Sequence, residues 1–199
     1  MGILLTGGTS RRMGFDKASM PISGVPCAAR VAAVLQAVVA DAIEVGPGVS
    51  GLPAVQEEPR GSGPLVALCA GARALNENGI ARPALVLACD LPLVTETVLW
   101  TLAEWPGSGS VVPIIAGQPQ PLCARWSAED LSASTDSVRA GMRSMRSLLE
   151  RPGVTMVEEK EWPTQVDRRV FSDVDTPADL VRTGVTVDRQ GTRGPTPCH

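Results

Sequence analysis

The chain has 199 residues, with 18 lysines and arginines against 21 aspartates and glutamates, and its formal net charge is −3. A chain of this length can bury a proper hydrophobic core as a single domain. No block of basic residues runs along it, and it contains no tyrosine and two phenylalanines, so we expect no nucleic-acid partner. This composition favours a small-molecule ligand.

The cysteines and the single histidine limit which catalytic sites the chain can form and which cellular compartment suits it. The five cysteines are spaced irregularly and form no CxxC pair, which predicts free thiols in a reducing cytoplasm. The single histidine is the last residue, His199, which argues against a Ser-His-Asp triad, a Cys-His pair or a His-ligated zinc site. The most apolar window, residues 27–45, contains too many charged and polar side chains to span a bilayer, so no membrane segment is expected.

Short apolar runs alternate with helix-like segments from the start of the chain onward. The strand-like runs are 2–5, 42–45, 54–56, 84–88 and 110–113. Apolar residues recur three and four positions apart in 26–39, 64–75 and 95–105, which begin with proline or threonine and are predicted to be helices. This alternation predicts an α/β fold with a mainly parallel sheet.

The second half of the chain is predicted to extend the same sheet. Segments 119–126 and 154–171 are typical of longer strands, and they flank a predicted helix from about 138 to 149. From Gly184 onward the sequence has little to bury, which predicts a flexible tail. We therefore expect one domain over residues 1–183 and a tail over 184–199.

A glycine-rich, basic segment, "LLTGGTSRRMGFDKA", begins in the first predicted strand. Gly7 and Gly8 follow that strand directly, at the carboxyl edge where α/β sheets bind ligands. Their N–H groups can face phosphate oxygens, and the side chains of Arg11, Arg12 and Lys17 add cationic donors. Neither the P-loop pattern nor the dinucleotide GxGxxG pattern is complete in the sequence, so the segment is either a different phosphate cradle or merely a flexible basic loop.

An acidic residue stands at the same predicted edge of the sheet. Asp90 follows the apolar run 84–89 in "LACDLPLV". A carboxylate at this place suits Mg²⁺, which takes one or two protein carboxylates together with phosphate oxygens and water. We therefore predict that Asp90 is a metal ligand, with capping of the helix that starts near Thr95 as the alternative.

Several motifs together resemble one enzyme family. The opening segment is similar to the signature loop LxGGxSxRMGxDK of nucleotidyltransferases of the molybdenum cofactor guanylyltransferase type. Four further segments extend the likeness over about residues 2–181: "EEPRGSGPLVAL", "LACDLPLV", "GMRSMRSLL" and "DVDTPADL". The resemblance implies a Rossmann-like three-layer α/β/α fold of the nucleotide-diphospho-sugar transferase type, acting as a monomer or weak homo-oligomer.

The resemblance also implies a reaction and its residues. The phosphate of molybdopterin would attack the α-phosphorus of GTP in line, with Mg²⁺ as cofactor and pyrophosphate as leaving group. Arg12, Lys17 and Asp90 would stabilise the charge that develops, with Asp90 holding the metal. The residues implied to bind the substrates are Leu5, Thr6, Gly7, Gly8, Lys17, Glu57, Gly63, Arg143 and Asp175.

Three of these assignments have a simpler alternative. Glu57 is implied to accept hydrogen bonds from guanine, with Glu58 as bystander, but both could belong to a solvated acidic loop. Arg143 is either a contact of the acceptor's phosphate or part of a solvated basic helix face. Asp175 either approaches the metal or acceptor or only caps a helix, and Asp173 and Asp175 stand where molybdopterin enzymes often have asparagines.

The overall function also has alternatives. One is a related transferase that uses CTP or a sugar-phosphate acceptor. Another, from a different class, is a nucleotide-binding regulatory protein that has lost turnover. The joint presence of Arg12, Lys17 and Asp90 favours an enzyme.

Overall fold

A mostly parallel sheet forms the centre of the protein. The computed structural model describes residues 1–7, 17–76, 82–164, 166–174, 179 and 184. The sheet order is β10-β7-β9-β6-β1-β4-β5, and β8 pairs with β7. The strands are β1 (Gly2–Leu5), β4 (Ala42–Val45), β5 (Ala54–Val55), β6 (Ala84–Ala88), β7 (Val111–Ile115), β8 (Gln118–Pro119), β9 (Cys123–Trp126) and β10 (Thr155–Glu158).

The register of this sheet sets the position of the ligand edge. β1 pairs in parallel with β4 and β6, and Leu5 stands level with both Val45 and Ala88. The three strands therefore end together, and the residues that follow them share one edge. The neighbouring strand β9 is antiparallel to β6 and β7, while β10 is parallel to β7.

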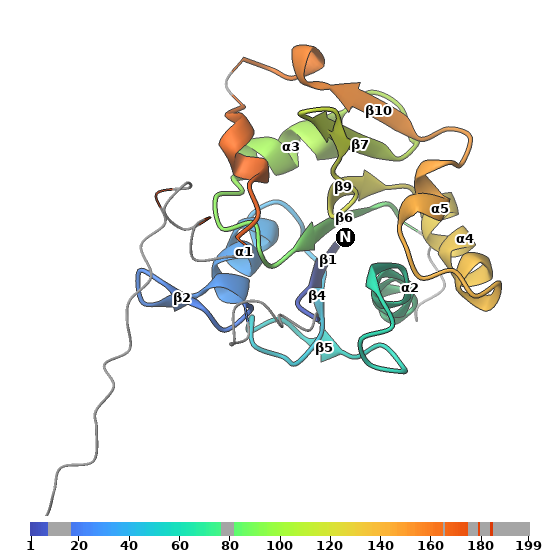
Figure 1. The fold of residues 1–199 in the computed structure, drawn as a ribbon, viewed down its shortest axis with the longest axis horizontal. Helices are drawn as coiled ribbons and strands as arrows, with labels where there is room; N and C mark the ends of the chain where they lie inside the picture. The colour runs from blue at the N-terminus through green and yellow to red at the C-terminus, as the bar shows by residue number, and fades with distance from the viewer. Residues whose placement is uncertain (8–16, 77–81, 165, 175–178, 180–183, 185–199) are drawn as a thin grey trace, which may run out of the picture.

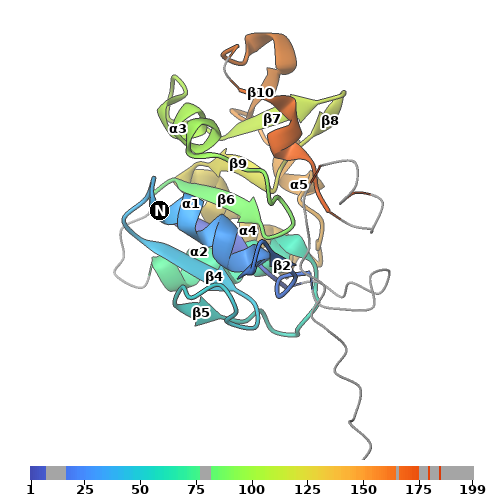
Figure 2. The same cartoon turned by 90° about the vertical axis from the view of Figure 1, so that its left-hand side faces the viewer.

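Helices cover both faces of the sheet (Figures 1 and 2). Helices α1 (Cys27–Gln36) and α3 (Glu96–Glu104) share one hydrophobic cluster with the sheet, centred on side chains such as Val31 and Leu99. Helices α2 (Pro64–Leu75), α4 (Ala128–Arg139) and α5 (Arg146–Leu149) share the cluster on the other face. The result is a three-layer α/β/α arrangement, and the predicted fold class is confirmed.

Smaller elements complete the described chain. A short antiparallel hairpin, β2 (Pro21–Ile22) with β3 (Val25–Pro26), precedes α1. Two 3₁₀ turns, η1 (Glu159–Glu161) and η2 (Arg168–Phe171), follow β10. No helix among the described residues is both long enough and apolar enough to cross a membrane.

The cysteines behave as their spacing predicts. Cys27, Cys69, Cys89 and Cys123 are all buried, and none of the four is part of a disulfide. Cys198 lies outside the described residues. Burial raises the pKa of the Cys27 thiol to about 12, and the nearby Asp90 charge adds to that effect. These thiols therefore act as small apolar core groups.

The predicted helix over 138–149 is wrong. Helix α4 ends at Arg139, and Gly141 has a φ of +86°, a conformation that favours glycine and stops the helix. The chain then runs as a turn until α5. Met145 and Leu148 are buried by this turn and short helix, so the apolar spacing that suggested one long helix has a different cause.

The strands predicted for 119–126 and 154–171 exist but are much shorter than predicted. The first is divided between β8 and β9, because residues 120–122 form a turn in which Cys123 N–H donates to the Gln120 carbonyl. The second contains only the short strand β10, followed by η1 and η2. The aromatic side chains of this second segment pack instead against α3, where Trp162 contacts both Trp105 and Phe171.

Helix α4 was missed because its sequence, "AEDLSASTDSVR", has few apolar residues. Its start is nevertheless encoded: the Ser127 hydroxyl accepts a hydrogen bond from Asp130 N–H, as an N-cap does. The buried Asp130 carboxylate accepts hydrogen bonds from Ser110, Ser127 and Arg151. Polar contacts thus attach this helix to the sheet and to the chain after α5.

Candidate functional site

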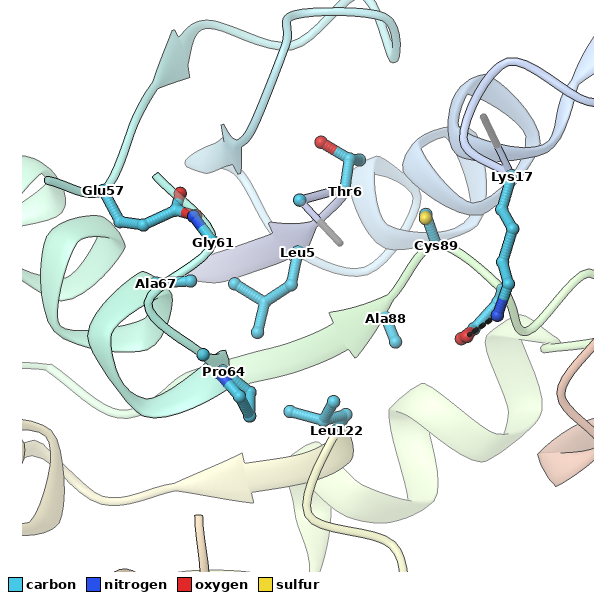
Figure 3. Close-up of a pocket in the computed structure, with 13 residues that line it drawn as sticks. Leu5, Thr6, Lys17, Glu57, Gly61, Pro64, Ala67, Ala88, Cys89 and Leu122 are labelled. Carbon is cyan, nitrogen blue, oxygen red and sulfur yellow. Dashed lines mark hydrogen bonds and ion pairs between the residues drawn. The ribbon is translucent and has the colours of Figure 1, made fainter. Parts of the chain in front are cut away.

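A pocket of about 370 Å³ lies at the carboxyl edge of β1 and β6 (Figure 3). It is within the size range of small-molecule sites. The predicted site residues that line it are Leu5, Thr6, Gly7, Lys17, Glu57, Gly63 and Asp90. Gly8, Arg12 and Asp175 lie outside the described residues.

The end of β1 forms one wall of the pocket. The N–H groups of Thr6 and Gly7 both donate to the Val45 carbonyl, at 3.0 and 3.3 Å, so the main chain turns against the end of β4. A Cβ atom at Gly7 would stand 3.4 Å from Oε1 of Glu57. The Gly7 main chain and the Glu57 carboxylate are therefore neighbours in this wall.

A lysine and an aspartate meet at another part of the pocket. Lys17 Nζ lies 3.6 Å from Asp90 Oδ2, and both side chains are mostly buried (dashed line in Figure 3). Burial raises the pKa of the Asp90 carboxyl above its usual value; the Lys17 ammonium opposes that shift, and the Asp173 carboxylate adds to it. Val174 N–H also donates to the Asp90 carbonyl at 3.0 Å, which attaches the chain after η2 to this corner.

Two glutamates predicted to differ in role differ sharply in exposure. Glu57 is 6% exposed, and its Oε1 accepts a hydrogen bond from Gly61 N–H at 2.9 Å. Glu58 is exposed and does not line the pocket. A carboxylate held in the wall is able to accept further hydrogen bonds from a ligand, because each oxygen has two lone pairs.

Gly63 shapes the start of α2. Its φ is +102°, and a Cβ atom there would approach the Arg143 carbonyl oxygen to 2.8 Å. Only glycine fits this position without movement of the neighbouring chain. Pro64 then opens the helix at its first position, and its side chain also lines the pocket.

Arg143 lies beside the site without lining it. Its carbonyl accepts a hydrogen bond from Leu65 N–H at 3.2 Å. Its exposed guanidinium donates to the carbonyls of Val138 and Met142, at 3.1 and 2.8 Å. In this conformation the side chain stabilises its own turn.

The apolar floor of the pocket was not predicted. Ala67, Ala88 and Leu122 line it together with the predicted Leu5, and Figure 3 shows Leu5 and Leu122 facing the same space. Leu122 lies in the turn between β8 and β9, where no site residue was predicted. Apolar side chains carry no chemical signal in the sequence that distinguishes a pocket floor from an ordinary core.

A divalent cation fits the Lys17 and Asp90 corner. Among the described residues, no three His, Cys, Asp or Glu side chains converge as a closed metal site would require. Mg²⁺ needs no such cage, since it is commonly held by one or two carboxylates, substrate phosphates and water. Asp90 offers a hard oxygen donor in the pocket wall, and Lys17 beside it offers a cation for phosphate oxygens.

Comparisons with known proteins agree on one family. A family model described as "MobA-like NTP transferase domain" matches residues 2–161. A probable molybdenum cofactor guanylyltransferase of Pelotomaculum thermopropionicum is 33% identical over 203 residues, which cover 96% of this chain and 95% of that protein. One of the same name from Haloferax mediterranei is 30% identical, covering 90% of each chain.

A solved structure is similar in fold. The crystal structure of molybdopterin-guanine dinucleotide biosynthesis protein A from Archaeoglobus fulgidus matches with a TM-score of 0.75 and 23% identity. The match covers 92% of this chain and 96% of that one. At this identity the likeness concerns the fold, whereas the family relationship rests on the sequence matches.

Proposed function

Since this chain belongs to the MobA-like NTP transferase family, we propose that it transfers GMP from GTP to the phosphate of molybdopterin. The observation that carries the proposal is one pocket that joins a cation and two carboxylates. These are Lys17, Asp90 and Glu57, at the carboxyl edge of a parallel sheet. The four buried cysteines, none of them in a disulfide, and the small substrates fit an enzyme of the cytoplasm.

The reaction is a displacement at phosphorus. An oxygen of the acceptor phosphate forms a new bond to the α-phosphorus of GTP, while the bond from that phosphorus to the bridging oxygen of the β-phosphate breaks. The electron pair of the broken bond leaves with pyrophosphate. The attacking oxygen is already ionised, so the protein has no proton to remove, and the pocket needs no general base.

Lys17 and Asp90 have different electrostatic roles in this reaction. The Lys17 ammonium is placed to contact phosphate oxygens on which negative charge grows as pyrophosphate departs. Asp90 is the residue that would hold Mg²⁺, and the predicted Arg12 is the second cation. When bound, Mg²⁺ neutralises phosphate charge and fixes the orientation of the substrate.

Glu57 selects the base. Guanine presents an N1–H and an amino group side by side, and this donor pair matches the two oxygens of a carboxylate. Adenine and cytosine lack that adjacent pair of donors. With either base the buried carboxylate would keep the hydrogen bond from Gly61 N–H but lose the pair of donors from the ligand, which costs binding free energy.

The test is a direct assay of the purified protein. It is incubated with Mg²⁺, molybdopterin and each of the four NTPs in turn, pyrophosphate release is measured, and the nucleotide product is identified. Pyrophosphate released with GTP, together with a guanine dinucleotide product, supports the proposal.

The same assay distinguishes the alternatives. Preference for CTP, or a product formed only with a sugar phosphate, identifies a related transferase with another substrate. Nucleotide binding without pyrophosphate release in the presence of any acceptor identifies a regulatory protein. Either result overturns the proposed reaction.

A further inference from the structure

A glutamate is fully buried within β4, the second strand from one edge of the sheet. Glu44 belongs to β4, next to β1, and is 0% exposed. A carboxylate at such a place is very costly unless nearby groups donate hydrogen bonds to it. Its partners therefore indicate why it is there.

Two groups of donors, from different parts of the chain, converge on this carboxylate. The loop after β4 supplies three N–H groups: Gly48 and Val49 donate to Oε1 at 2.7 and 3.1 Å, and Ser50 donates to Oε2 at 2.8 Å. The Thr6 hydroxyl, at the end of β1, donates to Oε1 at 2.6 Å. Glu44 thus connects a surface loop to a wall of the candidate site.

The carboxylate is charged at neutral pH in spite of its burial. Burial acts to raise the pKa of Glu44, but hydrogen bonds from Ser50, Thr6 and Val49 together outweigh it and lower the pKa below its ordinary value. A charged acceptor makes each of these hydrogen bonds stronger than a neutral one would be.

The Thr6 hydroxyl points toward this contact. Figure 3 shows its hydroxyl pointing away from the side of the pocket that Leu5 and Leu122 line. A Cβ atom at Gly46 would come within 2.0 Å of Thr6 Oγ1, so the space that the hydroxyl needs exists because residue 46 is glycine. The contact holds in place the main chain of Thr6 and Gly7, two residues that line the pocket.

We propose that Glu44 is a positioning residue of the nucleotide site. Through the Thr6 hydroxyl it holds the end of β1 against β4, so that the main chain of Thr6 and Gly7 forms a fixed wall for the nucleotide. The inference rests on the proposed function for the identity of the ligand. Glu44 contacts no substrate itself, and its effect on the reaction passes through Thr6.

Two nearly isosteric variants, Glu44→Gln and Thr6→Val, test the contact from both sides. Each removes or weakens the same hydrogen bond with little change in the shape of the side chain. We expect KM for GTP to rise about tenfold in each, with kcat within about twofold, as for a lost hydrogen bond to a charged group. The double variant should be no worse than Glu44→Gln alone, since both changes act on one contact.

The matched control is Ser50→Ala, which removes a hydroxyl from the loop side and leaves the Thr6 contact intact. It should lower the unfolding temperature without changing KM for GTP. Equal increases in KM for all three variants, in proportion to lost stability, would mean that Glu44 only stabilises the fold and would overturn the proposal.

A second measurement separates this inference from the proposed function. Hydrogen exchange at the Thr6 and Gly7 amides, which donate to Val45, needs no nucleotide. Exchange at least tenfold faster in Glu44→Gln, but not in Ser50→Ala, supports the positioning role; unchanged exchange overturns it. A wild type that turns over no NTP would instead overturn the proposed function. The exchange rates of the Thr6 and Gly7 amides would still test the role of Glu44.

Discussion

Replacement of Glu57 by glutamine tests how the site selects its base. The glutamine keeps the shape of the side chain and can still accept the hydrogen bond that Gly61 N–H gives to Oε1 at 2.9 Å. With its oxygen so engaged, the amide turns its NH₂ group toward the ligand. A donor then faces the N1–H or amino group of guanine, where the wild type offers an acceptor.

The size of the effect follows from the burial of this side chain. Glu57 is 6% exposed, so little water can replace a lost partner. A hydrogen bond to a charged group contributes about 1.5 to 3 kcal/mol, which corresponds to a loss in GTP affinity of roughly 10-fold to 150-fold. Affinity for CTP and ATP should change little, because neither base offers the lost donor pair.

Calorimetric titration with GTP, CTP and ATP measures this change in selectivity, and Glu58→Gln is the matched control. Glu58 is exposed and outside the pocket, so its variant should bind all three nucleotides as the wild type does. The unfolding temperature of Glu57→Gln should fall by no more than about 4 °C. A wild type that prefers CTP, or a loss of GTP preference in Glu58→Gln alone, would refute the assignment of Glu57.

Four further changes test the rest of the structure. Lys17→Ala should lower kcat/KM in the steady-state assay by at least about tenfold, and unchanged kinetics would remove Lys17 from the reaction. Asp90→Asn should keep the wild-type circular dichroism but lose most Mg²⁺-dependent turnover, since an amide is a poor ligand beside a carboxylate. Arg125→Met should lower the free energy of unfolding in urea by about 2 to 4 kcal/mol, because carbonyls that the guanidinium now satisfies lose their donor. Because the pKa of Glu44 is lowered on folding from 4.5, its stabilisation is complete above that pH and is lost as the pH falls through the folded value; acid titration of stability should show a smaller loss in Glu44→Gln.

The strands and helices at the centre of this fold are predicted well from the sequence, because each has a clear pattern of apolar residues. Apolar runs bounded by glycine or proline identify β1, β4 and β6. Apolar residues that recur three and four positions apart identify α1, α2 and α3. The rule that ligands bind at carboxyl ends of parallel strands then puts Gly7 and Asp90 at one edge. The structure has them there, since Leu5 and Ala88 are paired.

The second half is harder to predict because polar contacts determine it. Helix α4 has few apolar residues to give a period, and its attachment through Asp130 depends on Ser110 and Arg151, which are distant in sequence. Met145 and Leu148 show the converse case, in which apolar spacing typical of a helix belongs to a turn and one short helical segment. The pattern of apolar residues therefore fails both for a helix held by polar contacts and for a turn that buries apolar side chains.

Buried charges in strands point to a more general signal. Arg125 in β9 is 7% exposed and donates to four carbonyls of one segment, those of Ala103, Trp105, Gly107 and Gly109. Glu44 in β4 accepts N–H groups from the loop that follows its own strand.

Neither charge has an oppositely charged residue among these partners. Main-chain carbonyls compensate Arg125, and main-chain N–H groups together with the Thr6 hydroxyl compensate Glu44. Because an uncompensated charge inside a sheet is so costly, a single charged residue within an apolar strand predicts that a loop folds back to supply main-chain donors or acceptors. The sign of the charge gives the kind of group, N–H for a carboxylate and carbonyl for a guanidinium. By this reasoning, the glutamate in "AIEV" alone predicts a loop pinned beside β4, next to the strand that leads into the nucleotide site.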